Sequence, residues 1–320
     1  MTINLRATRP AELWGVIETL LGFAPDDDFI ILSLTPGGPH ARIDHPHDNA
    51  ALVGSVASLG ANFRRYPGDV MFIAVTDNPD HALDMVTATT AIMDGICEVR
   101  HALRIDGDNV YDAVTGDLID QITPDLRTKY RSAAVLAGRR TPTGSREALE
   151  ADLFPEREEV PAHHFEGLVG PDAQETFINR HSDEVAWVIE TVRTHAVTGL
   201  KPDDADAARL VIAVRNDTLL QAVIAQIDQD NANSHAALWN DLFSRCPAEH
   251  RGQPALVLAF AYWMAGDGAA AWMAYDRVTG WTIWQFQSLI RMVLTEAIRP
   301  GEWAKTEKAR QMAEWFSPDA

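Results

Sequence analysis

Apolar residues in the first part of the chain alternate between helical spacing and short continuous runs. In PAELWGVIETLLG, residues 10–22, they recur every three or four positions between a proline and a glycine, which predicts a helix. FIILSL, residues 29–34, and DVMFIAVTD, residues 69–77, are continuous apolar runs and predict strands that are buried on both faces. The pattern therefore predicts helices packed against a central sheet.

The segments between and after these two strands continue the alternation. Residues 41–44 can pair back onto the first strand, and residues 50–64 and 79–94 show helical spacing. Residues 97–106 and 110–116 predict a β-hairpin, because glycine and asparagine supply the turn between them. Alternating helices and strands over about 120 residues predict an α/β lobe, with a mixed sheet and flanking helices.

Beyond residue 124 the spacing becomes helical, and we find no convincing strand after residue 171. Residues 154–171 are rich in proline, glycine and acidic side chains, which predicts a linker or an exposed crossover. We therefore expect an α/β domain over residues 1–153 and an all-α domain over residues 172–320. Within the latter, helices are expected at 172–197, 203–214, 216–230, 233–245, 254–265, 269–278, 282–298 and 301–316.

The stretch AFAYWMAGDGAAAWMAYDRV, residues 259–278, predicts a helix hairpin with its turn at Gly266-Asp267-Gly268. It is similar to one tetratricopeptide-type unit, and helix hairpins side by side form a groove for a peptide or a partner helix. A plain helical bundle explains the same pattern. Seven of the 9 tryptophans lie between residues 239 and 315. They are interpreted either as part of a helix–helix core or as side chains that stack on a ligand.

The chain carries 46 acidic and 27 basic residues and a net charge of −19 at pH 7. Because there is no basic half or tail, direct contact with nucleic-acid phosphates or with an anionic membrane surface is disfavoured. An acidic DNA mimic that binds a DNA-processing enzyme is the alternative to an ordinary acidic soluble protein. The N-terminus shows no secretory signal pattern, and no window is apolar enough for a membrane span, so we expect a cytoplasmic location.

Patterns for metal, cofactor and covalent chemistry are weak. Cys97 and Cys246 are far apart in sequence, which fits a reducing compartment and excludes a cysteine-based zinc site. The histidines and carboxylates of residues 39–48, and the acidic run at 26–28, are interpreted as solvated turns. We find no GxGxxG pattern after a strand and no Walker A, HExxH or GxSxG pattern. We therefore expect no cofactor and no metal site, and no catalytic motif indicates an enzyme class.

One short stretch gathers positive charge: LAGRRTPTGSREALEADLF, residues 136–154. Arg139, Arg140 and Arg146 flank a turn, and Ser145 is a good N-cap for a helix with Glu147 in its first turn. The helix N-terminus and the guanidinium groups together predict a phosphate or carboxylate site formed by Arg139, Arg140, Ser145 and Arg146 at the domain junction. The alternative is that these arginines pair with carboxylates across the domain junction as a structural clamp.

Three stretches, in this order, resemble one protein family. They are PAELWGVIETLLGFAPDDDFIILSL at the start, AGRR with SREAL in the middle, and LWNDLFSRCPAEHRGQPALVLAFAYWMAGDGAAAWMAYDRV followed by RPGEW. The set is similar to domain-of-unknown-function family 4192, which occurs in actinobacteria and their phages. Only four of the 27 basic residues are lysines, a bias that fits a GC-rich genome of this kind. The resemblance implies no particular activity.

Two functional hypotheses follow, in addition to the DNA mimic. The first is a non-enzymatic interaction or regulatory protein whose helical domain binds a protein partner, because helix hairpins are expected and catalytic motifs are not. The second is an enzyme or sensor that binds a small anionic ligand, such as a nucleotide, near Arg139, Arg140 and Arg146. For a phage-encoded protein, the expected cytoplasmic location is that of the host.

Overall fold

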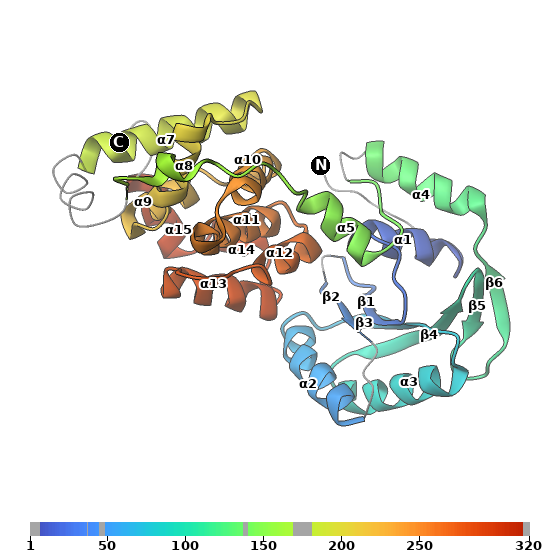
Figure 1. Cartoon of the computed structure of the whole chain (residues 1–320). Coiled ribbons are helices and arrows are strands. Elements are labelled where there is room, and N and C mark those ends of the chain that lie inside the picture. Colours follow the sequence, from blue (N-terminus) through green and yellow to red (C-terminus); the bar gives the residue numbers. More distant parts are fainter. Residues whose placement is uncertain (1–6, 37, 45–48, 137–139, 169–180, 316–320) are drawn as a thin grey trace. The chain divides into compact units, whose positions relative to one another are not determined.

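The structure, a computed structural model, describes residues 7–36, 38–44, 49–136, 140–168 and 181–315. The chain forms two compact units, Met1–Leu149 and Glu150–Ala320, which we call the first unit and the helical unit. The first unit holds a mixed sheet with flanking helices and the second is predominantly helical, which confirms the predicted fold class (Figure 1). The division falls before residue 150, inside a helix, whereas composition suggested a boundary after residue 153.

The first unit is built around a six-stranded sheet in the order β2-β1-β3-β4-β5-β6. In this sheet β3 and β4 pair in parallel through the crossover helix α3, and the other neighbouring strands pair antiparallel. The strands are β1 (Asp28–Ser33), β2 (His40–Asp44), β3 (Asp69–Val75), β4 (Glu98–Asp106), β5 (Asn109–Asp112) and β6 (Leu118–Gln121). The helices are α1 (Glu12–Leu21), α2 (Asn49–Arg65), α3 (Pro79–Met93), α4 (Pro124–Leu136) and the beginning of α5 (Arg146–Leu153).

Helices cover both faces of this sheet, and successive strand residues point to opposite faces. On β1, Ile30 and Leu32 belong to the core cluster that includes α1, whereas Phe29 and Ile31 belong to the cluster that includes α2 and α3. Figure 1 shows α1 and α4 on one side of the sheet and α2 and α3 on the other. Every residue of β1, and every residue of β3 after Asp69, is buried, which confirms the predicted two-sided burial.

The predicted hairpin of β4 and β5 is present, but its second strand is shorter than expected. The strand expected over residues 110–116 ends at Asp112, because the Asp112 carboxylate accepts from the N–H groups of Val114 and Thr115, both at 2.9 Å. The chain then turns into β6, which the sequence did not predict. Leu118 and Ile119 of β6 are both exposed, so no alternation of apolar and polar residues marks this edge strand.

The helical unit contains the helices that the spacing predicted, with shifted ends. The helix expected over residues 301–316 is two helices, because the Thr306 hydroxyl accepts from Ala309 N–H at 3.1 Å and starts a new helix. Residues 172–180 of another expected helix lie outside the described residues. The helices are α7 (His181–Thr198), α8 (Asp204–Ala213), α9 (Asp217–Ala225), α10 (Ala232–Arg245), α11 (Gly252–Met264), α12 (Gly268–Tyr275), α13 (Trp284–Thr295), α14 (Pro300–Trp303) and α15 (Glu307–Trp315), with the short 3₁₀ helices η1 (Ala162–Phe165) and η2 (Ala248–His250). Over the part of the chain described here, no helix is both long and apolar enough to span a bilayer.

Helix α11 forms the centre of the helical unit, since all 13 of its residues are buried. It packs against α10, α12 and α13. The ring of Phe260 lies 5.6 Å from that of Trp263, 6.1 Å from that of Phe286 and 5.7 Å from that of Trp303, between centroids. The expected turn at residues 266–268 joins α11 to α12. A helix that is apolar on every side belongs inside a bundle, and here α11 supports the three helices that pack around it.

A buried histidine of α10 makes the stability of the helical unit depend on pH. Burial lowers the pKa of the His235 imidazole from 6.5 to about 4, against the opposing effect of Asp228. The folded state thus binds fewer protons than the unfolded state between these two pH values. The free energy of unfolding is therefore at its full value above pH 6.5. It decreases as the pH falls toward 4, by roughly 3 kcal/mol in all.

A His235→Gln variant isolates this effect, because glutamine does not titrate. Urea unfolding at pH 7 and at about pH 4.5 should show that the wild type loses roughly 2 kcal/mol more than the variant. Carboxylates titrate in both proteins, so their contribution cancels in the comparison. Equal losses in the two proteins would mean that protonation of His235 does not cause the loss of stability at low pH.

Candidate functional site

The arginine turn predicted from the sequence is held by backbone hydrogen bonds to the loop after α1. The Thr143 N–H donates to the Gly22 carbonyl at 2.9 Å, and the Thr143 carbonyl accepts from Ala24 N–H at 3.0 Å. Ser145 caps α5 as expected, since its Oγ accepts from Ala148 N–H at 3.1 Å. The conformation of the turn is therefore fixed both by the neighbouring loop and by the helix that follows.

Carboxylates of the protein lie near Arg146 of this turn. Arg139 lies outside the described residues, and Arg140 and Arg146 both have contacts within the protein. Arg146 Nη1 lies 3.9 Å from Asp44 Oδ1. The pKa of Glu147 is lowered, first by a hydrogen bond from its own backbone N–H and then by the Ser145 hydroxyl. A carboxylate of the chain thus interacts with the N-terminus of α5, where an anionic ligand would have to bind.

Asp44 also belongs to a network of ion pairs at the end of β2. Arg42 Nη2 lies 2.6 Å from Asp44 Oδ1 and 2.6 Å from Oδ1 of the buried Asp28, and its guanidinium lies 5.3 Å from the centroid of the Phe23 ring. Burial raises the pKa of Asp28, and the hydrogen bond from Arg42 opposes that shift. Basic and acidic groups alternate along this network up to Arg146. The contact of Arg146 with Asp44 lies within the first unit, and both the clamp and the anion site stay predictions.

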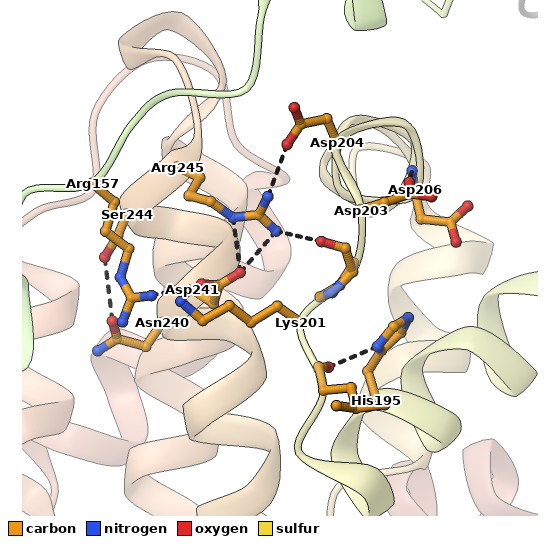
Figure 2. Close-up of polar contacts among 12 residues, drawn as sticks. Arg157, His195, Lys201, Asp203, Asp204, Asp206, Asn240, Asp241, Ser244 and Arg245 are labelled. Atoms are coloured by element: carbon orange, nitrogen blue, oxygen red, sulfur yellow. Dashed lines mark hydrogen bonds and ion pairs between the residues drawn. The ribbon is translucent and has the colours of Figure 1, made fainter.

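A second polar cluster, in the helical unit, surrounds Asp241, a buried residue of α10 (Figure 2). Its carboxylate lies 2.9 Å from Arg157 Nη1, 3.2 Å from Lys201 Nζ and 2.8 Å from Arg245 Nη2. The three cations come from the segment after α5, from the loop between α7 and α8, and from α10 itself. One buried carboxylate thereby joins three parts of the chain that are distant in sequence.

Arg245 extends this cluster to the start of α8. Its Nη1 donates to Asp204 Oδ1 at 3.0 Å, its Nη2 donates to the Pro202 carbonyl at 2.8 Å, and its Nε donates to Asp241 at 2.9 Å. Figure 2 shows the guanidinium between these acceptors. The planar guanidinium is suited to several simultaneous contacts. Because the N–H groups of Arg245 donate to acceptors within the protein, we interpret the Asp241 cluster as structural.

The same end of α10 holds the segment that composition suggested as a linker. Val160 donates its N–H to the Arg245 carbonyl at 2.8 Å, and Glu159 lies 2.8 Å from Arg251 Nη2. The side chains of Val160 and Phe165 are buried. In its described part, residues 154–168, this segment is thus attached to the helical unit by apolar burial and by charge pairs. The charge pairs are those of Glu159 with Arg251, which follows α10, and of Arg157 with Asp241 of α10.

The described residues show no arrangement for metal or thiol chemistry. Among them, no group of three or more His, Cys, Asp and Glu side chains is placed to hold a metal ion. Burial raises the pKa of the Cys246 thiol to about 12 and also raises that of Cys97. A nucleophilic thiol needs a lowered pKa, which requires nearby positive charge or a helix N-terminus. Neither cysteine has the environment of a nucleophile.

The tryptophans near the end of the chain divide into a buried and an exposed group. Three are buried and confirm the predicted helix–helix core: Trp239, Trp263 and Trp303. By contrast, Trp272 is 38% exposed, Trp281 is 47% exposed and Trp284 is 72% exposed. Large aromatic side chains are enriched at protein–protein interfaces, and burying one removes a large apolar area from water. The exposed tryptophans therefore mark a surface to consider as a binding site.

Trp284 begins an exposed face of α13, which we call the α13 stripe. The residues of this face follow one another at helical spacing, and Met292 is 42% exposed two turns after Trp284. The opposite face of the helix packs into the bundle through Phe286, Ile290, Val293 and Leu294. The α13 stripe consists of Trp284, Gln285, Ser288, Arg291, Met292 and Thr295.

The loop that leads into α13 is held tightly against the first turn of α11. The buried Gln253 accepts from Ile283 N–H through Oε1 at 2.8 Å. Gly252 approaches this loop so closely that a Cβ would lie 2.8 Å from the Trp281 carbonyl oxygen and closer still to that of Thr279. The Arg215 guanidinium lies 5.0 Å from the centroid of the Trp281 ring. Trp281 and the start of α13 are thus held in place by the fold.

The family model described as "Domain of unknown function (DUF4192)" matches residues 10–300, most of the chain. The chain belongs to this family. The matched range includes the arginine turn, the Asp241 cluster and the α13 stripe of this DUF4192 protein. Neither the curated proteins nor the solved structures contain a match to it.

For this DUF4192 chain, sequence reasoning anticipated the local features of the arginine turn and missed the other two sites. The Asp241 cluster joins positions separated by 84 residues, from Arg157 to Asp241, so no local pattern marks it. A signal for the α13 stripe was present. Phe286, Ile290 and Val293 define the buried face of the helix, and Trp284 lies off that face.

Proposed function

We propose that this protein is a non-enzymatic interaction protein that binds a protein partner through the α13 stripe. The observation that carries the proposal is the 72% exposure of Trp284 on a helix whose other face is packed in the bundle. Trp281, at 47% exposure, precedes it on an anchored loop. Tryptophan residues held in place before binding are typical energetic centres of protein–protein interfaces.

The small-anion alternative has less support. The carboxylates of Asp44 and Glu147 lie beside Arg146 of the turn, and they disfavour a second negative charge there. We therefore retain the partner-binding function as the conclusion. We further propose that the protein acts in the cytoplasm of an actinobacterium, or of the host of an actinophage, on the basis of its composition and its family resemblance.

Quantitative affinity purification tests the proposal. Tagged wild type, Trp284→Ala and Leu200→Ala are recovered from native cells after mild cross-linking, and the co-purified proteins are quantified by mass spectrometry. Leu200 is the matched control, because it is a strongly exposed apolar residue of the same unit outside the stripe. At least one protein should be recovered with the wild type and with Leu200→Ala, and about tenfold less with Trp284→Ala.

Equal urea midpoints for the three proteins are required, so that the difference reports binding rather than folding. If the same proteins are recovered in equal amounts with all three, the α13 stripe is not the binding surface.

A further inference from the structure

The end of the chain that carries the α13 stripe has an unusual charge. Residues 277–310 contain six basic residues and three acidic ones, whereas the whole chain carries a net charge of −19. Residues 277–295, which include the loop before α13 and α13 itself, contain no Asp or Glu. The segment that carries Trp284 therefore has a local charge opposite in sign to that of the protein as a whole.

Not all of these basic residues are available to a partner. Arg277 pairs with Glu150 at 3.2 Å and Arg310 pairs with Glu307 at 2.6 Å, so both are already used within the helical unit. Arg291 lies on the α13 stripe, is exposed, and is paired with no carboxylate within the described part of the chain. Exposed cations of this kind contribute to the orientation and rate of binding of an oppositely charged partner.

A small pocket adjoins the stripe. It has a volume of about 20 Å³ and lies among α9, α13, α14 and α15, with Leu220, Phe286 and Trp303 among its apolar walls. Gln285 belongs to both the pocket and the stripe, and the exposed Lys308 lies at the pocket as well. A space that holds about one water molecule is also large enough for the end of an aliphatic side chain.

Resting on the proposed partner-binding function, we infer that the partner segment that covers the α13 stripe is acidic and carries aliphatic side chains. Its apolar residues contact Trp284 and Met292, and one of them enters the pocket beside Gln285. Its carboxylates pair with Arg291 and Lys308. The stripe is 12 residues long, which corresponds to a segment of about three helical turns.

An acidic peptide fits better than a nucleic acid or an anionic membrane. Both of those are extended polyanions, and their binding requires many basic contacts over a large surface. The net charge of −19 on this chain opposes their approach. A short peptide that lies on α13 experiences mainly the charges within about 8 Å, the screening length at physiological salt. Arg291 is the one charged side chain of α13 itself, while Lys308 and Asp217, which have opposite charges, both line the adjoining pocket.

The test uses fluorescence anisotropy with the full chain and labelled synthetic peptides of about 12 residues. The probe peptide places Leu and Glu so that one helical face is apolar and the other acidic, and two counterparts replace each Glu by Gln or by Lys. The acidic peptide should bind at least about tenfold more tightly than the Lys peptide, and added salt should reduce the difference. Arg291→Glu should abolish the preference, whereas Arg193→Gln, which changes an exposed arginine of α7, should leave it intact.

Trp284→Ala should weaken binding of the acidic peptide by about tenfold. Equal affinity for the three peptides, or a preference that Arg291→Glu does not change, would overturn the inference. Single-stranded DNA and vesicles with anionic lipids serve as further probes, and tighter binding of either through Arg291 would also overturn it. If affinity purification still depends on Trp284 while the peptides show no charge preference, the acidic partner is wrong and the proposed function stands.

Discussion

Replacing Asp241 by asparagine is expected to destabilise the helical unit by roughly 3 kcal/mol or more. The substitution keeps the shape of the side chain but removes the negative charge that Arg157, Lys201 and Arg245 share. Lys201 is mostly exposed and can turn toward solvent, so its pairing contributes little. Arg245 is only 14% exposed, and it is the cation that would be left without its buried partner.

Urea unfolding followed by tryptophan fluorescence measures this effect, because all tryptophans except Trp14 belong to the helical unit. Asp204→Asn provides the matched control. It removes another carboxylate that pairs with Arg245, at 3.0 Å, but Asp204 is 46% exposed and its loss should cost less than about 1 kcal/mol. Equal effects of the two substitutions would show that the Asp241 cluster does not hold these segments together.

Replacing Gly252 by alanine is expected to destabilise the helical unit by roughly 1 to 3 kcal/mol. Alanine is the better helix former by about 1 kcal/mol, so helix propensity alone predicts the opposite sign. The added Cβ would meet the carbonyl oxygens of Thr279 and Trp281, and these backbone atoms cannot move away without shifting the loop. The same shift would displace Trp281 and the beginning of α13, and so would weaken the partner binding that we propose.

Gly268→Ala is the control for this prediction. Gly268 is the first residue of α12, as Gly252 is of α11, but a Cβ at Gly268 would meet no atom within 4 Å. We expect the Gly268 variant to be as stable as the wild type or more stable, by up to about 1 kcal/mol. Urea midpoints decide the question, and a stabilised Gly252→Ala variant would show that the loop is not packed as described.

The elements that were predicted well from the sequence are those whose apolar residues form a clear pattern along the chain. β1 and β3 are continuous apolar runs covered on both faces, so their residues alone determine their type. β6 was missed because Leu118 and Ile119 are exposed, and the strand exists only through pairing with β5. The break between α14 and α15 depends on a single hydroxyl cap at Thr306, which is a weak signal within a longer helical pattern.

The same holds for the candidate sites: features that depend on neighbouring residues were predicted from the sequence, and contacts between distant residues were not. Ser145 was predicted as a cap because capping depends on residues three positions apart. The contact of Arg146 with Asp44 and the convergence on Asp241 depend on how distant segments meet, which composition and spacing do not specify. The charge of residues 277–310 was readable in the sequence, but its significance depends on the exposure of Trp284 and Arg291 in the fold.

The measurement that tests the partner-binding account most directly is site-specific photo-cross-linking in native cells. A photoreactive amino acid replaces Gln285 within the α13 stripe or, as a control, Val197, an exposed residue of α7 outside it. The account predicts a discrete cross-linked protein from position 285 that is absent from position 197 and that disappears when Trp284→Ala is added. No cross-link from position 285, or the same products from both positions, would contradict it.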